Sequence, residues 1–130
     1  IFFTDRKFRP KIGTYNSMIS EGKSNIISNR ELFNNIQNIY ELEVQNIIAI
    51  GEDVLDRSIE LRNKYAYEIK YADFGSPIEI TDKQILADIY ISSSQLNYYT
   101  RQSVLLKKSI TELIEQIDIE YQSLEKNNQS

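Results

Sequence analysis

The hydrophobic positions of this chain recur at intervals of three and four residues along two long stretches. The first stretch follows a seven-residue repeat from Phe33 onward, with a second set of mostly apolar residues filling the half-steps. In order, these positions are Phe33, Ile36, Tyr40, Val44, Ile47, Ile50, Val54, Ser58, Leu61 and Tyr65. A stripe of this period lies on one face of an α-helix and packs lengthwise against another helix. The pattern predicts one long amphipathic helix over about residues 28–72.

The second stretch carries a stripe of similar length and period. Its positions are Leu96, Tyr99, Ser103, Leu106, Ile110, Leu113, Ile117, Glu120 and Leu124. They predict a second helix over about residues 82–126. Two matched stripes joined by a short turn are typical of an antiparallel helical hairpin. No sustained alternation of period two occurs, so we expect no sheet.

Start and stop signals agree with these bounds. Ser28 with Glu31, and Thr81 with Gln84, have the spacing of capping boxes, in which each side chain bonds the other residue's backbone N–H. Residues 73–77 contain a glycine and a proline and form the clearest turn. Gly22 ends a short helix over about residues 11–21, since glycine adopts the left-handed conformation at low cost. This short helix is expected to pack across the hairpin.

Two positions bear on the continuity of the long helices. Gly51 weakens a helix interior, but the apolar register runs through it without a change of phase, so we expect the first helix to continue. Residues 92–94 are three consecutive serines, where the second helix could bend or restart. The prediction is an all-α fold: an elongated hairpin with a short N-terminal helix, forming a single domain over residues 1–130.

Composition removes several classes of function. The net charge is -4 and the basic residues form no stripe, which argues against nucleic acid as a partner. The chain has no cysteine and no histidine, so thiol nucleophiles, histidine acid–base chemistry and conventional zinc sites are excluded within it. The acidic group Glu52, Asp53, Asp56 and Glu60 is interpreted as a solvated helix face rather than a magnesium site. We therefore expect no enzyme, no metal and no cofactor.

Aromatic residues gather near the predicted tip of the hairpin. A possible ligand or partner patch there consists of Tyr65, Tyr67, Tyr71, Phe74, Tyr98 and Tyr99. Tyrosine suits such a role because it combines apolar area with a polar tip. The alternative interpretation is that these rings form part of the core.

The segment over residues 14–40 resembles an uncharacterised family of membrane-anchored proteins from Bacteroidota. That family carries a motif of the form Thr-Tyr-x-x-Leu-Ile-x-x-Gly, then a hydrophobic pair, then Asn-x-x-Leu opening a long helix. The matching residues here are Thr14, Tyr15, Ile19, Gly22, Ile27, Asn29 and Leu32. The chain departs from the family in having Phe33 after the motif leucine and in lacking the anchor helix. The resemblance implies a helical, extracytoplasmic domain of an envelope protein and no particular activity.

These observations favour a non-enzymatic helical domain that acts through an unknown protein partner or through self-association. By the resemblance, we expect it to be the soluble part of a longer protein, reaching a membrane only through a segment outside this chain. The alternative is a small-ligand sensor whose pocket lies beside Tyr65, Tyr71, Tyr98 and Tyr99. An enzyme that uses the carboxylates of Glu52 and Asp56 is a third hypothesis.

Overall fold

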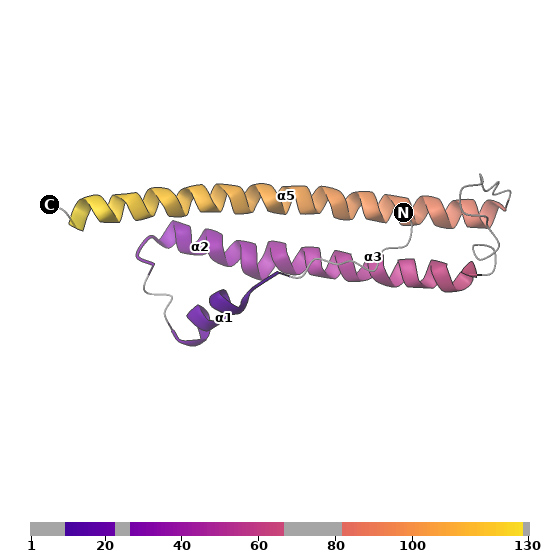
Figure 1. The fold of residues 1–130 in the computed structure, drawn as a ribbon, viewed down its shortest axis with the longest axis horizontal. Coiled ribbons are helices and arrows are strands. Elements are labelled where there is room, and N and C mark those ends of the chain that lie inside the picture. The colour runs from indigo at the N-terminus through magenta and orange to yellow at the C-terminus, as the bar shows by residue number, and fades with distance from the viewer. Residues whose placement is uncertain (1–9, 23–26, 67–81, 129–130) are drawn as a thin grey trace. The chain divides into compact units, whose positions relative to one another are not determined.

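The computed structural model describes residues 10–22, 27–66 and 82–128, and its regular secondary structure is helical (Figure 1). Helix α1 spans Gly13–Ser20. A longer helix consists of three consecutive parts, α2 (Arg30–Asn38), the π-helical turn η2 (Ile39–Glu43) and α3 (Val44–Lys64). Helix α5 spans Lys83–Asn128. The described residues contain no strand, so the prediction of an all-α fold is confirmed, whereas the predicted turn over residues 73–77 lies outside them.

The helix starts differ from the predicted capping boxes. Asn29, not Ser28, caps α2: its Oδ1 accepts the backbone N–H of Leu32 at 3.1 Å. Serine and asparagine are both good caps, but only Asn29 also has a side-chain partner across the fold, since its Nδ2 donates to Glu120 at 2.8 Å. At α5, Oδ1 of Asp82 accepts the backbone N–H of Gln84 at 2.7 Å. Thr81, the predicted cap there, lies outside the described residues.

Glycine positions follow the predictions. Gly22 has a φ of 65°, and its N–H donates to the carbonyl of Ile19 at 3.1 Å, just after the end of α1. Helix α3 continues through Gly51, and α5 continues through residues 92–94. Gly51 has a packing reason, since a Cβ built there would lie 3.2 Å from Cε2 of Tyr99. Close approach of this ring accounts for a glycine inside a helix.

The first predicted stripe is correct from Val44 onward, after the π-helical turn. Before the turn, the buried positions are shifted by one residue from the predicted ones. Leu32 and Ile39 are buried, whereas the predicted Phe33 and Tyr40 are only half-buried. From Val44 onward the predicted positions hold, with Ile47 among the most buried side chains. A π-helical turn inserts one extra residue into a helix, so it changes the phase of the stripe by one position. The prediction assumed a uniform helix and was wrong over this first part.

Contacts divide the chain into two compact units, described here one at a time. The described residues of the first unit are 48–66 and 82–101, and those of the second are 10–22, 27–47 and 102–128. The core of the first consists of Val54, Ser58, Leu61, Tyr65, Asp88 and Ser92. The core of the second consists of Tyr15, Leu32, Ile39, Val44, Ile47, Leu106 and Leu113.

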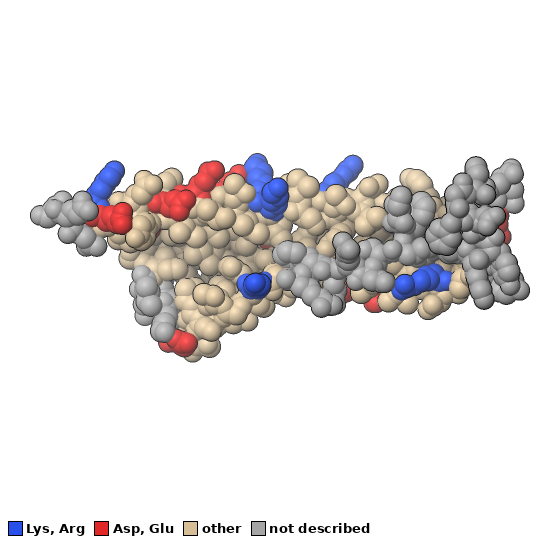
Figure 2. Space-filling model, viewed as in Figure 1, with Lys and Arg blue, Asp and Glu red and all other residues tan. Residues whose placement is uncertain are grey.

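Charged side chains are spread over the surface. Among the described residues, no helix is both long and apolar enough to cross a membrane. On the face seen in Figure 2, red carboxylate-bearing residues gather over the C-terminal half of α5.

Candidate functional site

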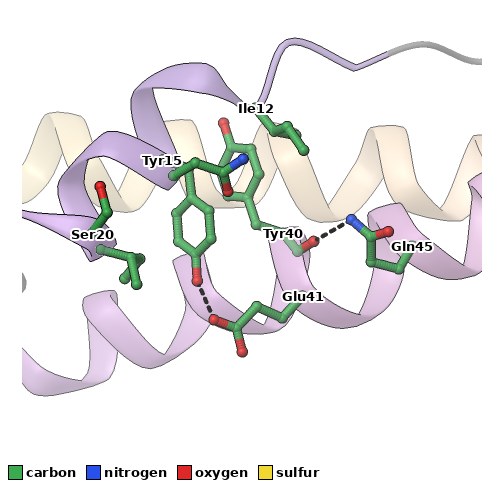
Figure 3. Close-up of a pocket in the computed structure, with 8 residues that line it drawn as sticks. Ile12, Tyr15, Ser20, Tyr40, Glu41 and Gln45 are labelled. Atoms are coloured by element: carbon green, nitrogen blue, oxygen red, sulfur yellow. Dashed lines mark hydrogen bonds between the residues drawn. The ribbon is translucent and has the colours of Figure 1, made fainter.

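A pocket lies in the second unit, beside α1 and η2 (Figure 3). Its volume is about 510 Å³. It is lined by Ile12, Tyr15, Asn16, Ile19, Ser20, Tyr40, Glu41 and Gln45. Figure 3 shows the ring of Tyr15 reaching from α1 toward the helix that carries Tyr40 and Glu41. The pocket therefore combines residues from two helical segments that are distant in the sequence.

Tyr15 is the central residue of this pocket. Its hydroxyl donates to Oε1 of Glu41 at 2.5 Å, and Gln37 donates to the other oxygen of that carboxylate at 3.1 Å. Its ring stacks on Tyr40 with 4.5 Å between the centroids and 5° between the planes. Burial and the neighbouring carboxylate of Glu41 raise the pKa of Tyr15 to about 12. The phenol thus stays protonated near neutral pH and acts as a hydrogen-bond donor.

The π-helical turn places both partners of Tyr15. Ile39 takes the buried position of the stripe, and the next two residues, Tyr40 and Glu41, are turned toward α1. Insertions of this kind are frequent at functional sites. The sequence analysis did not identify this group. A signal was present, because Leu32 and Ile39 are seven residues apart, whereas Ile39 and Ile47 are eight residues apart, which indicates an extra residue between them.

Chemically, the pocket offers two aromatic rings, two isoleucines and a single carboxylate, and no lysine or arginine lines it. Such a lining suits a small apolar molecule or one with a positively charged group. Nothing in it resembles an activated nucleophile.

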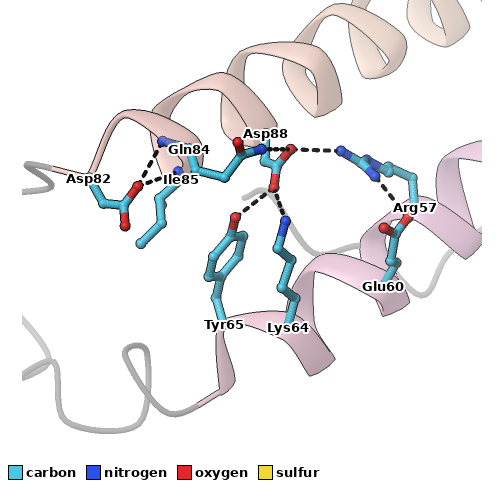
Figure 4. Close-up of polar contacts among 8 residues, drawn as sticks. All are labelled: Arg57, Glu60, Lys64, Tyr65, Asp82, Gln84, Ile85 and Asp88. Carbon is cyan, nitrogen blue, oxygen red and sulfur yellow. Dashed lines mark hydrogen bonds and ion pairs between the residues drawn. The ribbon is translucent and has the colours of Figure 1, made fainter.

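A second group of polar side chains surrounds Asp88 in the first unit (Figure 4). Asp88 is 5% exposed, and its Oδ2 accepts hydrogen bonds from Tyr65 at 2.5 Å and from Lys64 at 2.7 Å. Its Oδ1 accepts from Arg57 at 3.1 Å and from Gln84 at 3.3 Å. A buried carboxylate with four donors is well compensated.

These contacts fix the charge of the group. The hydrogen bond from Lys64, followed by that from Tyr65, lowers the pKa of Asp88 to about 2. The bond to Asp88 raises the pKa of Tyr65, and Asp88 likewise raises the pKa of Lys64. Asp88 is therefore ionised near neutral pH, and its hydrogen bonds tie α5 to α3.

The ion pairs here differ from the expected helix-surface pairs. The spacing of four residues along one helix would pair Asp53 with Arg57 and Glu60 with Lys64. Arg57 instead donates to Glu60 and Asp88, and Lys64 donates to Asp88. The hydrogen bond to Glu60 is the largest reason why the pKa of Arg57 is raised. Asp88 is not a position of the predicted second stripe, so the apolar spacing did not indicate that this carboxylate is buried.

The predicted tyrosine patch falls in several places. Tyr65 is buried against Asp88, Tyr99 is half-buried against Gly51, and Tyr98 is 52% exposed. Tyr98 borders an open hollow of about 330 Å³. Asp88 and Tyr98 are ten residues apart on α5, or about 15 Å along the axis, so the described members do not meet. Tyr67, Tyr71 and Phe74 lie outside the described residues, and the patch as a whole stays a prediction.

The acidic face of α3 has no metal-ligating geometry. Within the described ranges, no three Asp or Glu side chains are grouped so that they could hold a metal ion. Glu60 of this face accepts a hydrogen bond from Arg57 at 2.8 Å.

Comparison with known proteins gives no relative. No protein family model matches the chain, and no curated protein or solved structure matches it.

Proposed function

We propose that this chain is a non-enzymatic interaction domain that binds a protein partner through helix α5. The observation that carries the proposal is the number of large apolar side chains that α5 exposes. They are Leu86, Tyr90, Ile91, Tyr98, Val104, Leu105, Ile114, Ile117, Ile119, Tyr121 and Leu124. Single exposed apolar residues are ordinary, but many along one helix are typical of a surface that another protein covers.

In this proposal the two long helices form an antiparallel hairpin and α1 packs across it. Contacts inside each unit support that arrangement. In the first unit, Gly51 lies against Tyr99 of α5. Lys64, which comes later on the first long helix, bonds Asp88, which comes earlier on α5. In the second unit, Asn29 bonds Glu120 and Asn35 bonds Gln116, so the pairing again runs in opposite directions.

The proposed location is the extracytoplasmic side of a bacterial membrane, with the chain as part of a longer anchored protein. This part of the proposal rests on the resemblance of residues 14–40 to the membrane-anchored family from Bacteroidota. The absence of a membrane-crossing helix among the described residues is compatible with it.

A non-enzymatic role is supported by the state of the polar groups. Asp88 is ionised and held by four donors, and Tyr15 is held protonated against Glu41. Catalytic groups usually have a pKa close to the working pH, and both of these are shifted away from neutrality. They are better suited to holding helices together.

The test is affinity capture from the envelope fraction of a bacterium that encodes this chain. The control bait is the variant in which Tyr98, Leu105, Ile117 and Tyr121 are all replaced by glutamine, which keeps a good helix former at exposed positions. We expect the native chain to enrich at least one protein that the variant does not. Equal capture by both baits, or none by either, contradicts the proposal.

The second candidate is a small-ligand sensor, and the pocket at Tyr15 is the observation that favours it. We expect a small amine with an apolar body to raise the melting temperature of the native chain but not of Tyr40→Ala. A screen of such amines in which no compound separates the two proteins would exclude this candidate.

A further inference from the structure

The last part of α5 exposes an apolar stripe on one face, called here the C-terminal stripe. It consists of Ile114, Ile117, Tyr121 and Leu124, which are 53%, 41%, 63% and 46% exposed. Their spacing of three, four and three residues places all four on one side of the helix. Each is a residue type usually covered in a folded protein.

The C-terminal stripe lies beside the surface that α2 occupies in the same unit. Helix α2 and its cap bond Gln116 and Glu120, the residues just before Ile117 and Tyr121. One residue turns an α-helix by about 100°, so Ile114 and Tyr121 are turned away from these contacts. Ile117 and Leu124 each lie one turn beyond a packed residue, Leu113 and Glu120 respectively, and border the packed face. The face also widens here, because Ile114 occupies the position that Lys107 holds seven residues earlier. A wider apolar face on a helix indicates a second helical neighbour.

Helix α1 is not seen to be that neighbour. It packs where Tyr15 meets Tyr40 and Glu41, and no residue lining the pocket there belongs to α5.

Carboxylates outnumber basic residues around the C-terminal stripe, where Lys126 follows Glu125 and Lys108 pairs with Glu112 at 3.6 Å. From Ser109 to Glu125 the sequence has five carboxylates and no lysine or arginine. Asp118 and Glu125 each lie one turn beyond a residue of the stripe, Ile114 and Tyr121 respectively. Figure 2 shows these acidic residues gathered over the yellow and orange part of α5, with basic residues beyond each end of the group. A partner helix with basic flanks would complement this surface.

We infer that the C-terminal stripe is a docking site for a basic amphipathic helix of another protein. This inference rests on the proposed interaction function and specifies the chemistry of the partner. The partner's apolar residues, spaced by three and four, pack on the stripe, and its flanking lysines or arginines pair with Asp118 and Glu125. A second copy of this chain fits poorly, because its stripe would bring more carboxylates to the same place.

The direct test uses two synthetic helical peptides as probes. Both carry leucines at the spacing of the stripe; one has lysine and the other glutamate at all flanking positions. Binding to the full chain is measured by fluorescence anisotropy at low salt. We expect the lysine peptide to bind at least about tenfold more tightly than the glutamate peptide, and added salt to reduce the difference.

Two variants locate the binding on the C-terminal stripe. Ile117→Gln with Tyr121→Gln should weaken binding of the lysine peptide by about tenfold or more, because central apolar anchors dominate such interfaces. The matched control is Leu42→Gln with Ile59→Gln, which removes two exposed apolar residues that do not belong to α5 and should leave binding unchanged. Asp118→Lys with Glu125→Lys should reverse the preference, so that the glutamate peptide binds more tightly.

Several results would overturn the inference. Three of them come from the peptide test: the lysine peptide does not bind, both peptides bind equally, or the control variant loses as much affinity as Ile117→Gln with Tyr121→Gln. The fourth is that light scattering shows a dimer of the native chain that becomes a monomer in Ile117→Gln with Tyr121→Gln. The proposed function fails separately, if every envelope protein that the native chain captures is captured equally by the variant with four glutamine substitutions. If a captured partner binds the Ile117→Gln, Tyr121→Gln chain as well as the native chain, only the docking site is wrong.

Discussion

The two compact units stabilise their helices in different ways. Among the described residues of the second unit, the buried ones are all hydrophobic, and they include Leu106 and Leu113 of α5. Three of the buried side chains in the first unit, Ser58, Asp88 and Ser92, are polar or charged. Its helices also approach closely at Gly51, where the ring of Tyr99 leaves no room for a larger residue without rearrangement.

This difference indicates that one unit mainly stabilises the fold, while the other fixes how its helices align with each other. Apolar burial is the main favourable term in folding, but it is non-directional and tolerates sliding of one helix along another. A buried charge with several donors is satisfied at one alignment only, and leaving it unpaired is costly. We therefore expect the second unit to supply most of the free energy of folding and the Asp88 group to fix the alignment of α5 on α3.

The largest effect is expected from an apolar truncation in the second unit. Leu106→Ala should lower the free energy of unfolding by about 3 kcal/mol, since it removes a side chain that is 5% exposed. Chemical denaturation followed by circular dichroism measures it. The neighbouring Leu105→Ala is the control, because Leu105 is 55% exposed and its truncation should cost less than about 0.5 kcal/mol. Equal costs would mean that the second unit has no dominant apolar core.

The next effect concerns Asp88. Asp88→Asn should clearly lower the melting temperature at neutral pH, because it removes the charge that Lys64 and Arg57 face. The exposed Asp118→Asn is the control and should leave it unchanged.

The same carboxylate gives a pH dependence with a defined sign. The pKa of Asp88 falls from its usual 3.8 to about 2 on folding, so its stabilising contribution is present above pH 3.8 and is lost as the pH falls through about 2. Thermal melts from neutral to acid pH should show the native chain losing its advantage over Asp88→Asn in this window. A constant difference across the window would argue against the ionised, hydrogen-bonded state of Asp88.

A smaller effect is expected at the pocket of the second unit. Tyr15→Phe removes the hydrogen bond to Glu41 and should cost about 1 kcal/mol, whereas the half-exposed Tyr98→Phe should cost almost nothing. The pKa of Tyr15 is raised from 10.0 to about 12, so the hydrogen-bond contribution is present below pH 10 and is lost as the pH rises through about 12. Denaturation of the native and variant chains at increasing alkaline pH should show their stability difference shrinking. No change would mean that the hydroxyl of Tyr15 is not held by Glu41.

The smallest effect, and the finest test of close packing in the first unit, is at Gly51. Gly51→Ala gains about 1 kcal/mol of helix propensity but places a methyl group 3.2 Å from Cε2 of Tyr99, so we expect little net change. In the background of Tyr99→Ala the same substitution should stabilise the chain by about 1 kcal/mol. The double-mutant cycle isolates the contact, and additive effects would show that the ring of Tyr99 does not restrict Gly51.

Local patterns along the chain predict the helical class and much of the helix pattern. Apolar spacing predicted the buried residues from Val44 to Leu61 and from Leu106 to Leu113, because a helix that buries one face must repeat its apolar residues at the helical period. The stop at Gly22 followed from its freedom to adopt a positive φ. These are local properties of the chain, so they can be identified without knowing what each helix contacts.

Contacts between distant residues select among local choices that are equally acceptable in the sequence. Ser28 and Asn29 are both good caps, and the bond to Glu120 distinguishes Asn29. Apolar spacing placed Tyr40 on the buried stripe before Val44, whereas the π-helical turn buries Ile39 and turns Tyr40 toward Tyr15. Asp88 gave no local sign that Lys64, Tyr65 and Arg57 would converge on it. Each of these outcomes depends on contacts between residues that are distant in the sequence. A local sequence pattern carries no information about the energies of such contacts.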